Sequence, residues 1–129
     1  MALSFPKSRR LTSNRQFKAV LDQGRRIGNR VLTLYVAPNA CGYPRLGVSV
    51  GKACGKAVVR NRLKRLLREA FRQSQQRVRP DFDYVLMIPP TLARRLKEPR
   101  TRAQTLATLD LQKVQEAFLR LIEGLDRTK

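Results

Sequence analysis

The chain has 129 residues, enough for one compact domain and too few for two. Its 28 lysines and arginines outnumber 9 acidic residues, which gives a formal net charge of +19, and its 42% hydrophobic content argues against disorder. Such a charge predicts a polyanionic partner, and the lack of a long apolar segment argues against a membrane. The N-terminal segment has no apolar run typical of a secretion signal, so we expect a cytoplasmic protein.

The N-terminal part of the chain predicts a basic arm followed by a helix. Residues 1–10 are basic and have no periodic pattern, so we expect a flexible arm. Ser13 is a suitable N-cap, and Gln16 three positions later completes a capping box. The helix should run to about Gln23 and end at Gly24.

Alternating residues then predict strands. In the first, the two faces carry Leu32, Leu34 and Val36 on one side, and Val31, Thr33 and Tyr35 on the other. In the second, the two faces carry Leu46, Val48 and Val50, and Gly47, Ser49 and Gly51. A division into Arg25–Thr33 and Leu34–Ala37 would give the order α-β-β-β-α-β-α, and the pattern leaves this open. Helices should cover the apolar face, and the other face could receive a ligand.

A strongly basic helix is predicted from about Lys56 to Gln73–Arg77. Its apolar stripe consists of Val59, Leu63, Leu66, Leu67, Ala70 and Phe71. Its cations are Arg60, Arg62, Lys64, Arg65, Arg68 and Arg72. An ordinary solvated surface helix mixes both charge signs, whereas Glu69 is the only acidic residue here. We therefore favour nucleic-acid binding over a merely solvated face.

The C-terminal part predicts a buried strand over Tyr84–Ile88 and a last helix from about Asp110. Between them we expect an irregular connection over residues 89–108, with a short helical turn at Leu92–Lys97. The elements together predict a single α/β (α+β) two-layer sandwich.

Residues for catalysis or metal binding are few. The chain has no histidine, so it offers no imidazole base, and Cys41 and Cys54 alone cannot form the usual structural zinc site. We interpret them as free thiols. Asp81 and Asp83 are close in sequence, and turn formation behind Pro80 is the plainer role for them than a metal-binding pair. We expect no metal or cofactor bound by the protein itself.

Two aromatic residues are candidates for stacking on unpaired bases. Tyr35 lies on the strand face opposite the predicted core, and Phe17 could equally be a core anchor of the first helix. An open sheet face with small residues and an aromatic ring suits a single RNA strand better than a duplex. We expect the partner of the chain to be RNA, with no DNA partner.

Three segments carry a resemblance to a known family. They are Arg45–Val50, Gly55–Arg65 with its Arg-Asn-Arg sequence, and Arg68–Phe71. Together they resemble the bacterial ribonuclease P protein subunit. Further matching positions are Arg10, Leu11, Phe17, Gly24, Arg30, Tyr35 and the apolar strand Tyr84–Ile88.

The resemblance implies a fold and a function. The fold would be a small α/β sandwich with a mixed sheet of about four strands and three helices, in which the motif helix joins two parallel strands by a left-handed crossover. The protein would not be the catalyst. A large RNA subunit with Mg²⁺ would remove the 5′ leader of precursor tRNA, and the protein would bind that RNA and the single-stranded leader.

The resemblance also assigns residues. The surface for the RNA subunit would comprise Arg60, Asn61, Arg62, Lys64, Arg65 and Arg68. The leader-binding cleft would comprise Phe17, Tyr35, Ser49, Lys52 and Lys56. The chain departs from the family pattern at Leu21, where a second aromatic is common, and at Ala53, where a second lysine is common. The alternative is a ribosomal-type structural RNA-binding protein; a free-standing protein nuclease is disfavoured by the missing histidine.

Overall fold

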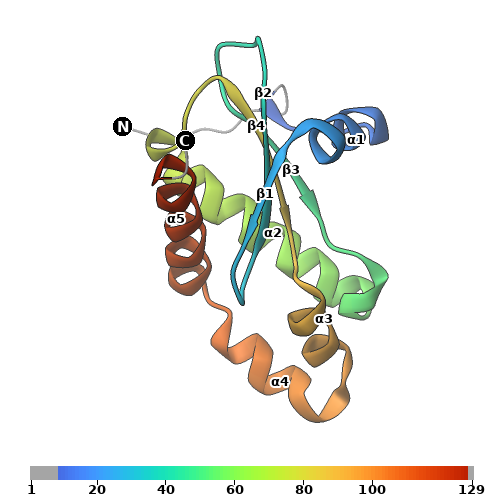
Figure 1. Cartoon of the computed structure of the whole chain (residues 1–129). Helices are drawn as coiled ribbons and strands as arrows, with labels where there is room; N and C mark the ends of the chain where they lie inside the picture. Colours follow the sequence, from blue (N-terminus) through green and yellow to red (C-terminus); the bar gives the residue numbers. More distant parts are fainter. Residues whose placement is uncertain (1–8, 128–129) are drawn as a thin grey trace.

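The computed structural model describes residues 9–127 (Figure 1). The elements in chain order are α1 (Asn14–Gln23), β1 (Arg25–Gly28), β2 (Thr33–Pro38), β3 (Arg45–Ser49), η2 (Lys52–Cys54), α2 (Ala57–Ser74), η3 (Gln75–Arg77), β4 (Phe82–Met87), α3 (Pro90–Lys97), α4 (Pro99–Thr108) and α5 (Leu111–Arg127). The predicted N-terminal arm lies outside the described residues except for Arg9 and Arg10.

The strands form one mixed sheet in the order β1-β2-β4-β3. The pairs β1–β2 and β2–β4 are antiparallel, whereas β3 and β4 are parallel. Helix α2 is therefore the crossover between two parallel strands. This arrangement confirms the predicted four-stranded mixed sheet.

Helices cover the two faces of the sheet unequally (Figure 1). Helices α2 and α5 pack against one face around a large core, which includes Leu34, Leu67, Phe71 and Phe118. Helix α1 covers only part of the other face, above a small cluster of Leu11, Val20, Ala37 and Val85. Part of that second face therefore stays open, as the alternation of apolar and small residues predicts.

The first helix begins and ends as its sequence predicts. The backbone N–H of Gln16 donates to Ser13 Oγ at 3.1 Å, and the backbone N–H of Ser13 donates to Gln16 Oε1 at 3.2 Å. This reciprocal pair is the expected capping box. The helix ends at Gln23, and the N–H of Gly24 donates to the carbonyl of Val20 at 2.7 Å.

The boundary between the first two strands differs from the proposed division. The turn lies between Gly28 and Thr33, because Asn29 Oδ1 accepts from the backbone N–H groups of Val31 at 3.0 Å and Leu32 at 2.9 Å. The amide of Asn29 also donates to the carbonyl of Ala117 in α5 at 3.1 Å. One asparagine therefore fixes the turn and ties it to the helix layer.

The short helical turn expected at Leu92–Lys97 is confirmed within α3, but the expectations of three helices and of an otherwise irregular connection over residues 89–108 are wrong. The described residues contain five α-helices, and two of them, α3 and α4, occupy this segment. A proline stands in the first turn of each, where its missing N–H leaves no hydrogen bond unmade. Helix α3 buries Leu92, Ala93 and Leu96 in the large core.

The interpretation of Asp81 and Asp83 as turn residues is confirmed for Asp81, which lies in a turn with Pro80, and wrong for Asp83. Asp83 belongs to β4 and is buried, whereas Asp81 is exposed. The guanidinium of Arg45 donates to both carboxylate oxygens of Asp83, each at 2.7 Å, and Asn39 Nδ2 donates to Oδ1 at 2.7 Å. Asp83 therefore holds together the ends of three chain segments and is not free to bind a metal.

Candidate RNA-binding surface

The open face of the sheet presents two rows of side chains. Cross-strand pairing aligns the first row as Arg26, Tyr35, Val85 and Gly47. It aligns the second row as Gly28, Thr33, Met87 and Ser49. Thr33, Gly47 and Val85 are buried, and we call the accessible positions of these rows the open face: Arg26, Gly28, Tyr35, Ser49 and Met87. It combines an aromatic ring, a cation and small or uncharged side chains, and these are the groups that can hold a single strand of RNA.

Phe17 and Tyr35 occupy different places at this face. Both rings are partly buried against the small cluster that includes Val20 and Val85. Phe17 comes from α1 and packs over Gly47, so it forms the wall where α1 meets the sheet. Tyr35 lies on β2 and is half-buried like Phe17, but its neighbour in the first row is the exposed Arg26. Tyr35 is therefore the better placed of the two to stack on a base.

Ser49, Lys52 and Lys56 continue from the end of β3. Ser49 lies on the open face and is partly exposed, one row away from Tyr35. Lys52 is exposed in the short helix η2. Lys56 is exposed at the N-cap of α2, at the start of the helix layer. Lys56 thus stands where the chain leaves the open face and enters the basic helix.

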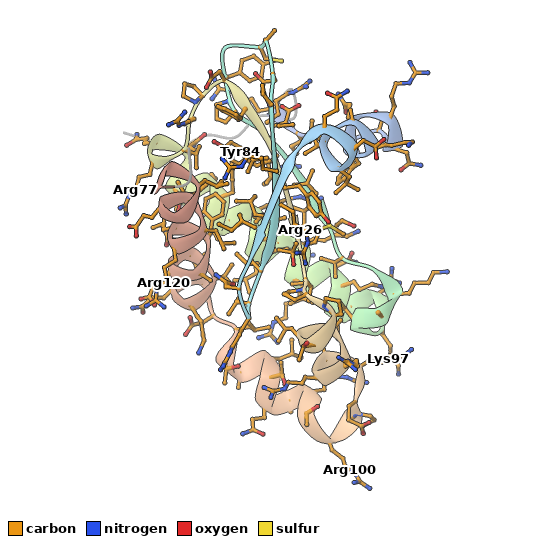
Figure 2. The ribbon with its side chains drawn as sticks, viewed as in Figure 1. Arg26, Arg77, Tyr84, Lys97, Arg100 and Arg120 are labelled. Atoms are coloured by element: carbon orange, nitrogen blue, oxygen red, sulfur yellow. The ribbon has the colours of Figure 1, made fainter. Side chains whose placement is uncertain are left out.

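Arg26 is a residue that sequence reasoning missed. It is exposed on the edge strand β1, labelled in Figure 2, and lies directly beside Tyr35 in the β1–β2 register. A cation next to an aromatic ring can bind the phosphate of a base that stacks on the ring. The signal in the sequence was weak, because β1 has only four residues and three of them are arginine or glycine.

The basic helix α2 presents its predicted cations beside two hollows. The first hollow has a volume of about 630 Å³, and its lining includes Asn61, Arg62 and Arg65. All three side chains are exposed. Arg60 has a structural contact as well, because its Nε donates to the carbonyl of Gly55 at 3.2 Å and so holds the start of the helix.

The second hollow is surrounded mainly by arginines. Its volume is about 470 Å³, and it is lined by Arg10, Arg65, Arg68, Glu69 and Arg72. Burial, followed by the charge of Arg10, lowers the pKa of Arg68. Like charges in one hollow repel each other, and a phosphate group would relieve that repulsion.

Arg10 is the second residue that sequence reasoning left out of the site. It is fixed beside the edge strand β3 by a bridge to Leu46, where the N–H of Leu11 donates to the Leu46 carbonyl at 2.8 Å. Its Nε is buried and has no hydrogen-bond partner among the described residues. Arg10 and Arg68 therefore converge from segments far apart in sequence, which no local pattern reveals.

Glu69 limits the charge of this surface. Its carboxylate accepts hydrogen bonds from Arg72 and, at 2.9 Å, from Gln73. These hydrogen bonds lower the pKa of Glu69 to about 2. The carboxylate therefore stays ionised at neutral pH and neutralises part of the charge of Arg72.

Lys64 completes the predicted set. It is partly buried and lies one helical turn from Arg60 and from Arg68. All six residues predicted to bind an RNA partner thus belong to the same helix, which packs against the opposite side of the sheet from the open face. The two candidate surfaces are therefore separate.

Other site types find no support in residues 9–127. They contain no group of three or more aspartate, glutamate, histidine or cysteine side chains able to hold a metal ion. None of their helices is long and apolar enough to cross a membrane. Both cysteines are free thiols; Cys41 is exposed and Cys54 is buried.

Comparison with known proteins supports one family. The sequence model of the Ribonuclease P family matches residues 5–120. The ribonuclease P protein component of Shouchella clausii is 46% identical over 82 residues, which cover 63% of this chain and 67% of the relative. That of Lactobacillus delbrueckii subsp. bulgaricus is 38% identical over 112 residues, which cover 85% and 92%.

Solved structures agree with the sequence comparison. The ribonuclease P protein of Thermotoga maritima is 29% identical and superposes with a TM-score of 0.74, covering 89% of this chain and 96% of that one. The protein of Staphylococcus aureus, at 22% identity and a TM-score of 0.72, shares the fold and covers 92% and 96% of the two chains.

Proposed function

We propose that two surfaces of this chain, which belongs to the bacterial ribonuclease P protein family, bind different RNAs. Helix α2 binds the catalytic RNA subunit. The open face binds the single-stranded 5′ leader of precursor tRNA. As a component of ribonuclease P the protein takes part in tRNA processing. The observation that carries the proposal is the separation of the two candidate surfaces. Because they lie on different layers, the chain can contact both RNAs at once.

The α2 surface suits a folded RNA. Asn61, Arg62 and Arg65 are exposed along one helix, so they can contact phosphates on neighbouring strands. The arginine-lined hollow beside Arg10 and Arg68 adds a place for a phosphate group. Guanidinium groups bind phosphates through paired hydrogen bonds, and this favours arginine over lysine here.

The open face suits an unpaired strand. Tyr35 offers a ring for stacking, Arg26 lies beside it, and Ser49 and Lys52 follow toward η2. Stacking on an aromatic ring does not require a particular base, because every base has a π-face. This surface would therefore accept leaders of different sequence.

The protein contributes binding and position, and we assign the hydrolysis to the RNA subunit with Mg²⁺. The open face has no histidine and no pair of carboxylates that could act as acid and base. By binding the leader, the protein would hold the precursor in place more tightly than the product, which has no leader. Because cleavage removes the leader, the affinity for the mature tRNA would be lower than the affinity for the precursor.

The test is a reconstitution with the cognate RNA subunit at a low magnesium concentration. Adding the protein should raise both the affinity for precursor tRNA and the rate of cleavage. A ribosomal-type RNA-binding protein would give neither gain, and a protein nuclease would cleave without the RNA subunit. Either of these results would overturn the proposal.

A further inference from the structure

Helices α3 and α4 form a firmly built hairpin. At the corner between them, Nε of Arg102 donates to the carbonyl of Leu96 at 2.8 Å, and an Nη atom of Arg102 donates to the carbonyl of Lys97 at 2.8 Å. The hydroxyl of Thr101 donates to the carbonyl of Arg95 at 2.6 Å. Because Leu96 is also buried in the large core, the hairpin is a fixed part of the molecular surface.

A groove separates this hairpin from the turn between β1 and β2. Its volume is about 610 Å³, and its lining residues are Gly28, Asn29, Arg30, Pro89, Thr91, Leu92 and Arg95. Arg30 comes from the turn and Arg95 from α3, and both are exposed. The turn is held by Asn29, as described above, so both walls of the groove are rigid.

The groove continues the open face. Gly28 lines the groove and is also the β1 member of the second row, in which Ser49 stands on β3. Pro89 lines the groove and follows β4 by two positions. Thr33 in this row is buried, so an RNA strand that passes Ser49 and Met87 would meet the protein surface again at the exposed Gly28, where the groove begins.

The charge of the hairpin favours an RNA strand as the occupant. Its only acidic residue is Glu98. Its basic residues are Arg94, Arg95, Lys97, Arg100 and Arg102. A helical hairpin with one sign of charge attracts a polyanion, and Figure 2 shows Lys97 and Arg100 directed outward from it.

We propose that the groove binds the phosphodiester backbone of the 5′ leader, with Arg30 and Arg95 as its phosphate contacts. The inference rests on the proposed function and extends it: leader nucleotides that run past the open face would be held between the β1–β2 turn and α3. The chain would thus recognise a longer leader than the open face alone can cover.

The experiment compares holoenzymes on precursors with leaders of increasing length, under magnesium concentrations too low for cleavage. The variant combines Arg30→Ala with Arg95→Ala. For wild type, affinity should rise with leader length up to a plateau. For the variant, the affinity should reach its plateau at a shorter leader. For long leaders, the slope of log affinity against log salt concentration should be smaller by about two. Short leaders should bind both proteins equally.

The matched control combines Arg94→Ala with Arg100→Ala. These residues belong to the same hairpin, carry the same charge and do not line the groove. The control should keep the wild-type plateau. Equal losses for control and variant would show a general charge effect, and equal losses for all leaders would show that the groove binds the RNA subunit. Either result, or no change at all, would overturn the inference.

A third holoenzyme separates this inference from the proposed function. Tyr35→Ala alters the open face and leaves the groove intact. If Tyr35→Ala lowers affinity for leader-bearing precursors while the groove variant does not, only the groove inference fails. If Tyr35→Ala has no effect that depends on the leader, the proposed function fails.

Discussion

The ring of Phe17 in α1 rests on the bare backbone of Gly47 in β3. A Cβ added at Gly47 would lie 2.7 Å from Cζ of the ring and 3.2 Å from Cβ of Leu11. The first separation leaves no room for a methyl group unless the ring moves, and the second is tighter than an ordinary van der Waals contact. The absence of a side chain at Gly47 therefore sets how closely α1 approaches the sheet, and with it the wall of the open face.

Replacing Gly47 should disturb both stability and leader binding. We expect Gly47→Ala to lower the free energy of unfolding by about 1–3 kcal/mol, because the ring must move. Urea denaturation measures this loss, and a binding assay with a leader-bearing precursor measures the effect on the open face. Gly51→Ala is the control, since an added Cβ there meets nothing within 4 Å. Equal stability of the two variants would contradict the account.

Tyr35 should contribute through its ring. Tyr35→Ala should weaken binding of leader-bearing precursors by roughly 1–3 kcal/mol, the contribution of one stacked base, and should leave mature tRNA almost unaffected. Tyr35→Phe should restore most of the affinity, because the ring remains. Equal losses for precursor and mature tRNA would rule out a role in leader stacking.

Arg65 should act as a phosphate contact on α2. Arg65→Ala should weaken binding of the RNA subunit and reduce the slope of log affinity against log salt by about one. Arg120→Ala is the control; Arg120 is exposed on α5, and Figure 2 shows it pointing away from the sheet. If both variants keep the wild-type slope of log affinity against log salt, Arg65 makes no phosphate contact and is merely solvated.

The ion pair of Arg45 and Asp83 should matter for stability. Arg45→Met leaves the Asp83 carboxylate, which is 6% exposed, without its charged partner, and we expect a loss of about 3–5 kcal/mol. The pair of Lys18 and Asp22 offers a contrast, because both side chains are largely exposed. Lys18→Met should therefore shift the midpoint of thermal unfolding far less than Arg45→Met does. A similar cost for both variants in thermal unfolding would contradict the assigned role.

Local patterns predicted most elements of the fold. The capping box of Ser13 and Gln16, the faces of β2 and β3 and the extent of α2 depend on neighbouring residues, and all appear as expected. In the segment 89–108, a helical turn was predicted at the position of α3, whereas α4 was missed for a physical reason. Within α4, Thr105 is the only buried residue, so its sequence has no clear apolar stripe.

The sequence predicted the candidate-site residues that lie within one element. It missed the residues that come together from segments far apart in the chain. The α2 cations share one helix, so helical spacing brings them together. Arg26 meets Tyr35 only through the strand register, and Arg10 meets Arg68 only through the bridge to β3. Asp83 and Arg45 form their ion pair although they lie 38 positions apart in the chain. Such pairings follow from the sheet topology, which spacing in the sequence does not specify.

The central claim, that the open face holds the leader, can be tested by crosslinking. In a variant with Cys41→Ser, the change Ser49→Cys places one reactive thiol on the open face. Burial raises the pKa of the Cys54 thiol, so this residue stays protonated and unreactive near neutral pH. A photoactivatable group attached at position 49 then reports which RNA lies beside the face in the assembled holoenzyme. Arg120→Cys in the same background is the control.

We predict that position 49 crosslinks to nucleotides of the 5′ leader and that position 120 does not. Crosslinks from position 49 to the RNA subunit alone, or equal leader crosslinking from both positions, would contradict it.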